Sequence, residues 1–136
     1  MNFDDIKIMW EKDSIIDNLE LDKEAIKIPQ LHSKYSNLMY DFKMLQDKAE
    51  GELKVVVKEL WEYYKGVGNE PQPLKILKQD LPMHIEADEK YINASLKLKY
   101  YTNIVNFLKD IINNINNRSF QIKNSIDWQK FINGIN

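Results

Sequence analysis

The sequence predicts a mainly α-helical chain made of long amphipathic helices. Apolar residues recur three and four positions apart over most of its length, which is the spacing of one face of an α-helix. Only four glycines and four prolines among 136 residues are available for turns. With 43% apolar and 29% charged residues, the composition is typical of a soluble globular protein of one domain.

Two short helices are expected before residue 30. The first is marked by apolar residues that share a helix face, namely Phe3, Ile6, Met9 and Trp10. Asp13 and Ser14 then offer a break, and Asp17 can cap a second helix. We expect that helix to end near Ile28, because Pro29 disfavours helical geometry in the residue before it.

A much longer helix is predicted from Leu31 to Tyr64. Its apolar residues follow one another at intervals of three or four, and they are Leu31, Tyr35, Leu38, Phe42, Leu45, Ala49, Leu53, Val56, Leu60 and Tyr64. Such a helix is about 50 Å long at about 1.5 Å per residue, which is too long to be buried inside one small globule. We therefore expect it to pack partly on another chain or to bend, with Gly51 as the weak point.

A loop and a short extended arm are expected after this helix, over residues 66–87. Residues 66–73 read GVGNEPQP, and their glycines and prolines favour turns. Residues 74–86 contain short alternating pieces and Pro82, which predict an extended arm or a small hairpin.

A third long helix is predicted to begin at Asp88 and Glu89, because acids complement the dipole at a helix N-terminus. It carries two adjacent apolar stripes, and so wide an apolar arc needs partners on two sides. We therefore predict self-association through Leu96, Tyr100, Ile104, Phe107, Leu108, Ile111 and Ile115. Arg118 and Ser119 interrupt this helix, and a shorter amphipathic helix follows over 120–136. The N-terminal helices (1–65), the loop and arm, and the C-terminal helices (88–136) form one predicted domain, 1–136.

The residues that are missing disfavour several classes of function. There is no cysteine, which excludes disulfides, thiolate metal sites and cysteine nucleophiles. His32 and His84 lack the spacing of metal ligands, and the acids are scattered among lysines with no pair suited to acid–base catalysis. Gly66 and Gly68 lack the further residues of a dinucleotide or nucleotide loop. We expect no enzymatic activity, no metal and no cofactor.

Neither a secretory signal nor a membrane span is predicted. The first residues carry acids where a signal peptide carries basic residues. No segment approaches the roughly 18 uninterrupted apolar residues of a membrane helix. A cytoplasmic location is expected.

The stretch GELKVVVKELWEYYKGVG, residues 51–68, is the candidate surface for a polyanion. On a helical wheel of 100° per residue its cations and one large aromatic lie within about 60° of one another, opposite the apolar stripe, and they are Lys43, Lys54, Lys58, Trp61 and Lys65. Single-stranded nucleic acids bind where basic groups follow phosphates and exposed rings stack on bases. Tyr63 and Tyr64 follow as further candidate rings. The alternative is a solvated face with Trp61 under a neighbouring subunit.

A second basic group lies near the C-terminus. Arg118 and Lys123 are candidate contacts for nucleic acid, with Lys130 nearby and Phe120 and Trp128 as neighbouring rings. The alternative is that the rings are core or subunit contacts, and that Arg118 only complements the dipole at the end of a helix.

Four pieces of the sequence, in one register, are similar to those of a known family. They are LHSKY at 31–35; Lys58, Tyr63, Tyr64, Gly66 and Gly68 in the pattern KxxxxYYxGxG; Ser95, Leu96 and Tyr100; and RSFQIK at 118–123 followed by Ile126, Trp128, Phe131 and Gly134. With the chain length, these pieces resemble the UvsY family, the recombination mediators of T-even-type bacteriophages.

The resemblance implies a ring-like homo-oligomer of six or seven subunits that acts in the cytoplasm of the infected bacterium. Such proteins bind single-stranded DNA that is coated by the phage single-strand-binding protein, weaken that protein's hold, and help a RecA-like phage recombinase to load. It also implies that the C-terminal region mediates self-assembly, and that basic residues just before the paired tyrosines bind DNA. Lys54 and Lys58 match that pattern.

The chain departs from the family pattern in two respects. Leu60 stands where the pattern has a basic residue, and the formal net charge is −2. Trp61 and Lys65 are expected to compensate for the missing cation. The rival interpretation is a helical oligomeric scaffold or adaptor that binds protein partners and has no direct affinity for DNA.

Overall fold

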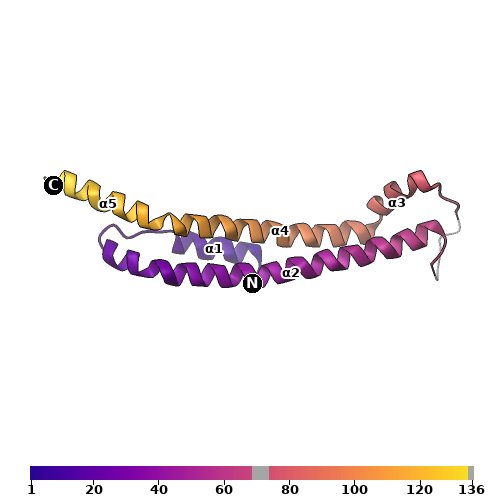
Figure 1. Cartoon of the computed structure of the whole chain (residues 1–136), viewed down its shortest axis with the longest axis horizontal. Helices are drawn as coiled ribbons and strands as arrows, with labels where there is room; N and C mark the ends of the chain where they lie inside the picture. The colour runs from indigo at the N-terminus through magenta and orange to yellow at the C-terminus, as the bar shows by residue number, and fades with distance from the viewer. Residues whose placement is uncertain (69–73, 135–136) are drawn as a thin grey trace. The chain divides into compact units, whose positions relative to one another are not determined.

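The computed structural model describes residues 1–68 and 74–134, which are helical over most of their length and contain no strand (Figure 1). The elements are α1 (Phe3–Asp13), α2 (Leu21–Lys65), a 3-10 helix η1 (Lys78–Asp80), α3 (Leu81–Ala87), α4 (Glu89–Asn116) and α5 (Arg118–Ile132). The predicted mainly α class is confirmed. None of the described helices combines the length and the apolar character needed to cross a membrane.

The chain forms two compact units, and both long helices contribute to each of them. The terminal unit consists of Met1–Asp41 and Asn106–Asn136, and the middle unit of Phe42–Val105. Each unit is described separately below.

In the terminal unit, α1 packs on the first half of α2 and on the last part of α4. Phe3 contacts Phe107, and the Trp10 ring meets Tyr35 edge to face at 5.4 Å between centroids. The core consists of fully buried or nearly fully buried residues from four helices, including Ile6, Leu21, Tyr35, Leu108, Ile111, Ile115 and Ile122. Ser14 caps the end of α1, as the predicted break required.

In the middle unit, the second half of α2 runs antiparallel to the first part of α4. Three side-chain contacts mark this pairing along its length, and they are Gln46–Thr102, Glu52–Lys97 and Tyr64–Asp88. The core includes Phe42, Ala49 and Leu60 of α2, Leu81 and Ile85 of α3, and Ile104 and Val105 of α4. The long helix is continuous through Gly51, and part of its apolar stripe is buried by its own chain.

The expected end of a helix at Ile28 is wrong, because α2 runs through Pro29 to Lys65. Pro29 cannot donate a hydrogen bond to the carbonyl of Ala25, which costs about 3 kcal/mol in a helix interior. The helix has buried core side chains on both sides of the proline, Leu21 and Tyr35, and their packing offsets that cost. Asp17 does not cap this helix but accepts a hydrogen bond from the Leu19 amide in the preceding turn.

The expected extended arm is also wrong over residues 78–87, whereas residues 74–77 lie outside any helix. Residues 78–87 are helical, first as η1 and then as α3. Pro82 lies in the first turn of α3, where a missing amide hydrogen breaks no helical bond. Leu81 and Ile85, one turn apart, are both buried and hold α3 in the core. The part of the predicted loop at 69–73 lies outside the described residues, as do residues 135–136 at the end of the last predicted helix.

The predicted self-association stripe is divided between the two units. Leu108, Ile111 and Ile115 are buried in the core of the terminal unit, so they are not free to contact another subunit as expected. Ile104 is likewise buried in the middle unit, whereas Leu96 and Tyr100 are 58% and 41% exposed. The sequence expectation failed for the buried residues because the chain supplies its own partners, α1 and α2, for this part of α4.

Candidate nucleic-acid interface

An exposed row of cations runs along α2 in the middle unit. We call Lys54, Lys58 and Lys65 the lysine row; all three are exposed, and among the described residues none forms an ion pair. Their intervals of four and seven residues keep them on one face of the helix, about 16 Å from first to last. Lys43, which shares this face, is also exposed.

Trp61 lies between two members of the row, and the ammonium of one of them lies over its ring. The Lys65 ammonium is 4.3 Å from the centre of the Trp61 ring system, and Trp61 is 42% exposed. Such a contact at an exposed site stabilises by about 0.5–1 kcal/mol. It brings an aromatic ring and a cation together, which is the combination that grooves for single-stranded nucleic acids use.

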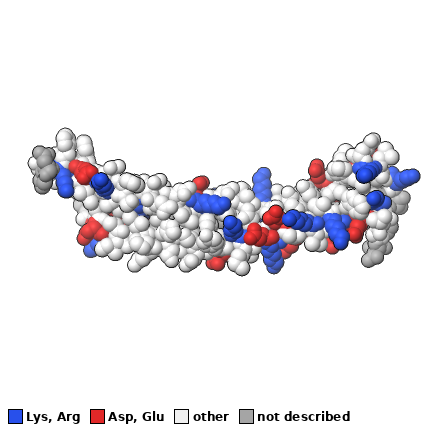
Figure 2. Space-filling model, viewed as in Figure 1, with Lys and Arg blue, Asp and Glu red and all other residues white. Residues whose placement is uncertain are grey.

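The positive charge is local. Lysines and acids are interspersed on the face drawn in Figure 2, which has no broad surface of one sign. The net charge of −2 agrees with this mixture. Polyanion binding would therefore depend on the short lysine row rather than on the field of the whole protein.

The paired tyrosines differ in their surroundings. The Tyr64 hydroxyl donates a 2.6 Å hydrogen bond to the Asp88 carboxylate, and its ring lies 5.6 Å from His84 between centroids. Chiefly because of this hydrogen bond, and also because of burial, the pKa of Tyr64 is raised to about 12. Tyr64 is thus engaged within the chain, whereas Tyr63 is 39% exposed.

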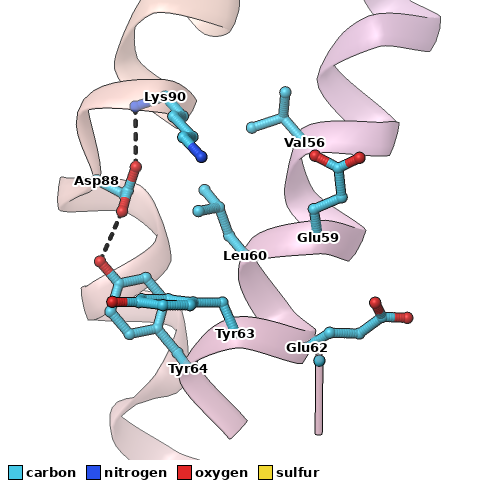
Figure 3. A pocket seen from close by; sticks show the side chains of 9 residues that line it. Val56, Glu59, Leu60, Glu62, Tyr63, Tyr64, Asp88 and Lys90 are labelled. Carbon is cyan, nitrogen blue, oxygen red and sulfur yellow. Dashed lines mark hydrogen bonds between the residues drawn. The ribbon is translucent and has the colours of Figure 1, made fainter. Parts of the chain in front are cut away.

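A groove of about 790 Å³ lies beside the tyrosines (Figure 3). Its walls include Val56, Leu60, Tyr63, Tyr64, Asp88 and Lys90. Leu60 itself is only 4% exposed and packs in the core of the middle unit. Leu60 points away from the lysine row, because it follows Lys58 by two positions and is therefore about 200° from it around the helix axis. The position where the chain departs from the family pattern therefore serves packing.

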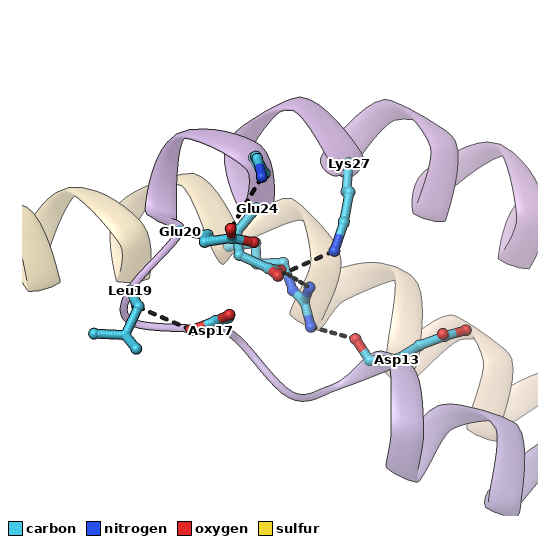
Figure 4. A network of polar contacts seen from close by, with 8 residues as sticks. Asp13, Asp17, Leu19, Glu20, Glu24 and Lys27 are labelled. Carbon is cyan, nitrogen blue, oxygen red and sulfur yellow. Dashed lines mark hydrogen bonds and ion pairs between the residues drawn. The ribbon is translucent and has the colours of Figure 1, made fainter.

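Arg118, expected on a second basic surface, is instead buried in the terminal unit and only 1% exposed. Its Nη2 atom donates a 2.6 Å hydrogen bond to the Asp13 carbonyl, and its Nη1 lies 3.8 Å from Glu24 Oε2 (Figure 4). The guanidinium also lies 5.9 Å from the centre of the Trp10 ring. Arg118 therefore joins α5 to α1 and α2, and no face of it is open to a phosphate.

The sequence contained a signal for this burial. Arg118 continues the spacing of the buried residues Ile111 and Ile115, and Ile122 follows four residues later. The stripe thus passes through the short break at Asn117 with an arginine at a core position. Lys123, the other predicted contact, is exposed on α5, and so are Phe120, Trp128 and Phe131, which are not core residues of this chain.

Asp13 is the polar centre next to Arg118. Its carboxylate accepts hydrogen bonds from the Lys34 ammonium and the Tyr35 hydroxyl, each at 2.7 Å. Burial alone would raise the pKa of Asp13, but these hydrogen bonds and the nearby charges of Lys34 and Arg118 outweigh it and lower the pKa. Burial and the bond to Asp13 raise the pKa of Tyr35. These groups hold the end of α1 against α2.

Comparison with known proteins gives the same result in sequence and in structure. A family model described as "Recombination, repair and ssDNA binding protein UvsY" matches residues 9–135. Recombination protein uvsY of Enterobacteria phage T4 is 27% identical over 133 residues, which covers 96% of this chain and 97% of that protein.

Crystal structures of the bacteriophage T4 recombination mediator protein UvsY are similar over nearly the whole chain. The structure in lattice type II has a TM-score of 0.90 at 27% identity and covers 96% of this chain and 97% of that chain. The structure in lattice type I has a TM-score of 0.86 at 27% identity, with coverage of 93% and 98%.

Proposed function

The chain belongs to the UvsY family of recombination, repair and single-stranded-DNA-binding proteins, and from this premise we propose that it is a recombination mediator that binds single-stranded DNA through the lysine row of α2. The observation that carries the proposal is that Lys54, Lys58 and Lys65 are exposed beside an exposed Trp61 and form no ion pair with any residue that the structure describes. Family membership alone would not indicate which surface meets the strand.

Each part of this surface has a separate physical role. The lysines neutralise phosphates and release counterions, which gives a slope of log affinity against log salt near −0.7 for each phosphate on a single strand. Trp61 stacks on a base, which contributes about 1–3 kcal/mol without sequence preference. Tyr63, which is partly exposed, provides a second ring.

The finer steps of the proposal follow from the family. The protein assembles as a hexameric or heptameric ring, weakens the hold of the phage single-strand-binding protein, and promotes loading of a RecA-like recombinase in recombination and repair. Several copies of a modest lysine row in one assembly bind a strand multivalently, so weak single sites still give tight binding. We place the subunit contacts of α4 at its exposed part, where Leu96 is 58% and Tyr100 is 41% exposed.

The proposal is tested by fluorescence anisotropy of a labelled oligo-dT at several salt concentrations. We expect salt-sensitive binding that is weaker to duplex, and a shallower salt slope for Lys58→Ala. Lys48→Ala is the matched control, because Lys48 is exposed on the same helix but lies about 80° from Lys58 around its axis. Equal salt slopes for wild type and Lys58→Ala would contradict the proposal that Lys58 contacts the strand.

The second candidate function is a helical scaffold that binds proteins and has no direct affinity for DNA. The net charge of −2 and the exposed apolar side chains of α5, such as Trp128 and Phe131, favour it. It predicts no change of anisotropy with oligo-dT even at low salt, together with retained capture of the recombinase or the single-strand-binding protein.

A further inference from the structure

We propose that Tyr64 and Asp88 form a clasp that positions the last turn of α2, and with it Trp61 and Lys65, for contact with a DNA strand. This inference rests on the proposed function of the lysine row. It gives Tyr64 a different role from the base-stacking one that the sequence predicted, because Tyr64 acts through its neighbours and not by touching the strand.

The clasp connects three elements of the middle unit. The Tyr64 hydroxyl donates to Asp88 Oδ2 at 2.6 Å, and Asp88 Oδ1 accepts from the Lys90 amide at 2.9 Å (Figure 3). The second bond caps the N-terminus of α4, so the same carboxylate fixes α4 and holds α2. The Tyr64 ring also lies against His84 of α3.

The last turn of α2 ends at Gly66. Gly66 has φ +86°, a conformation that favours glycine, and the Gly66 and Val67 amides both donate to the Glu62 carbonyl, at 3.1 and 2.9 Å. These bonds end the helix but do not attach it to another element. The Tyr64–Asp88 hydrogen bond attaches the last turn of α2 to the start of α4, at a helix end that would otherwise fray.

Distance along the helix decides which cations the clasp affects. Trp61 and Lys65 lie within one turn of Tyr64, whereas Lys54 is ten residues away, or about 15 Å along the axis. A side chain that is held in its bound position loses less conformational entropy on binding. Loss of the clasp therefore weakens the contribution of Lys65 and leaves that of Lys54 unchanged.

Double-mutant cycles for oligo-dT binding by the full chain test this directly. Tyr64→Phe keeps the ring and removes the hydroxyl, and we expect it to weaken binding about two- to tenfold. When Tyr64→Phe is combined with Lys65→Gln, the loss of affinity should be clearly smaller than the product of the two single losses. Combined with Lys54→Gln, the two effects should multiply to within about twofold, because the residues are far apart. A general loss of stability would affect both cycles equally.

The outcomes separate the clasp from the proposed function. If Tyr64→Phe leaves binding unchanged, or if its effect multiplies equally with both lysine variants, the clasp is overturned and the lysine row stands. If Lys54→Gln and Lys65→Gln each leave binding unchanged, the proposed function fails and the clasp with it. Asp88→Ser keeps a capping oxygen for the Lys90 amide but is too short to reach the Tyr64 hydroxyl, so it should reproduce the coupling pattern and replaces Tyr64→Phe if circular dichroism shows that variant to be unfolded.

Discussion

Each unit contains one cation placed over a tryptophan, and the two pairs serve different purposes. In the terminal unit, the Arg118 guanidinium lies 5.9 Å from the Trp10 ring centre and is 1% exposed. In the middle unit, the Lys65 ammonium lies 4.3 Å from the Trp61 ring centre at the surface. The same pairing stabilises the fold in one unit and remains available to a ligand in the other.

Burial accounts for this difference. Arg118 of α5 lies against α1 and α2, and its planar guanidinium donates to the carbonyl of Asp13 while it faces the carboxylate of Glu24. The lysine row lies opposite Leu60, and no other helix supplies a carboxylate within ion-pair distance of it among the described residues. A cation beside an aromatic residue therefore indicates a nucleic-acid surface only where nothing packs over it.

The largest expected effect is on the buried cation. Arg118→Met removes the donor to the Asp13 carbonyl and one of the two cations beside Glu24, which keeps its 3.2 Å ion pair with Lys27. Losing the hydrogen bond from this buried charged donor costs about 1.5–3 kcal/mol in the free energy of unfolding, and losing the cation–ring contact with Trp10 adds up to about 2 kcal/mol. Urea denaturation at fixed protein concentration measures it. Lys123→Met on the same helix is the control and should change stability by under about 0.5 kcal/mol. Equal effects of the two variants would mean that Arg118 does not hold the unit together.

The next effect is on binding and concerns the exposed ring. Trp61→Ala should lower the affinity for oligo-dT by about 1–3 kcal/mol, because one base loses its stacking partner. The salt slope should stay the same, since no cation is removed, and the free energy of unfolding should change little. Trp61→Phe keeps a ring and should retain most of the affinity. A changed slope with unchanged affinity at high salt would assign Trp61 to electrostatic positioning instead of stacking.

The smallest effect is a pH dependence of the terminal unit. The pKa of Asp13 is lowered from 3.8 in the folded chain, so its ionised form stabilises the fold above the unfolded pKa. That stability is lost as the pH falls below about 4. Asp13→Asn should therefore be less stable than wild type at pH 7, by about 1 kcal/mol, and should show a weaker loss of stability on acidification. Parallel curves of unfolding free energy against pH for the two proteins would contradict this assignment.

The helical class could be predicted from sequence because it depends on local periodicity, and tertiary packing explains the errors. Pro29 has a strong local preference against the helix, but buried side chains on either side hold α2 together. Pro82 suggested an arm because a proline near an N-terminus and one in a turn look alike in sequence. The division of α4 between two cores depends on contacts with α1 and α2 that no local pattern encodes.

The candidate site shows the same limit. A helical wheel correctly places Lys54, Lys58 and Trp61 on an exposed face, because they lie opposite a long apolar stripe. It does not show that Tyr64 is bonded to Asp88, since that contact joins residues 24 positions apart. Nor does it separate Arg118 from a surface cation, because its partners come from α1 and α2.

The most direct test compares the salt dependence of oligo-dT binding for wild type and for the triple variant Lys54→Gln, Lys58→Gln, Lys65→Gln. We predict that the slope of log affinity against log salt becomes shallower by about 2 for each subunit that contacts the strand, three times about 0.7. The free energy of unfolding should stay within about 0.5 kcal/mol of wild type. An unchanged slope in a folded triple variant would contradict the central claim that the exposed lysine row of α2 binds the strand.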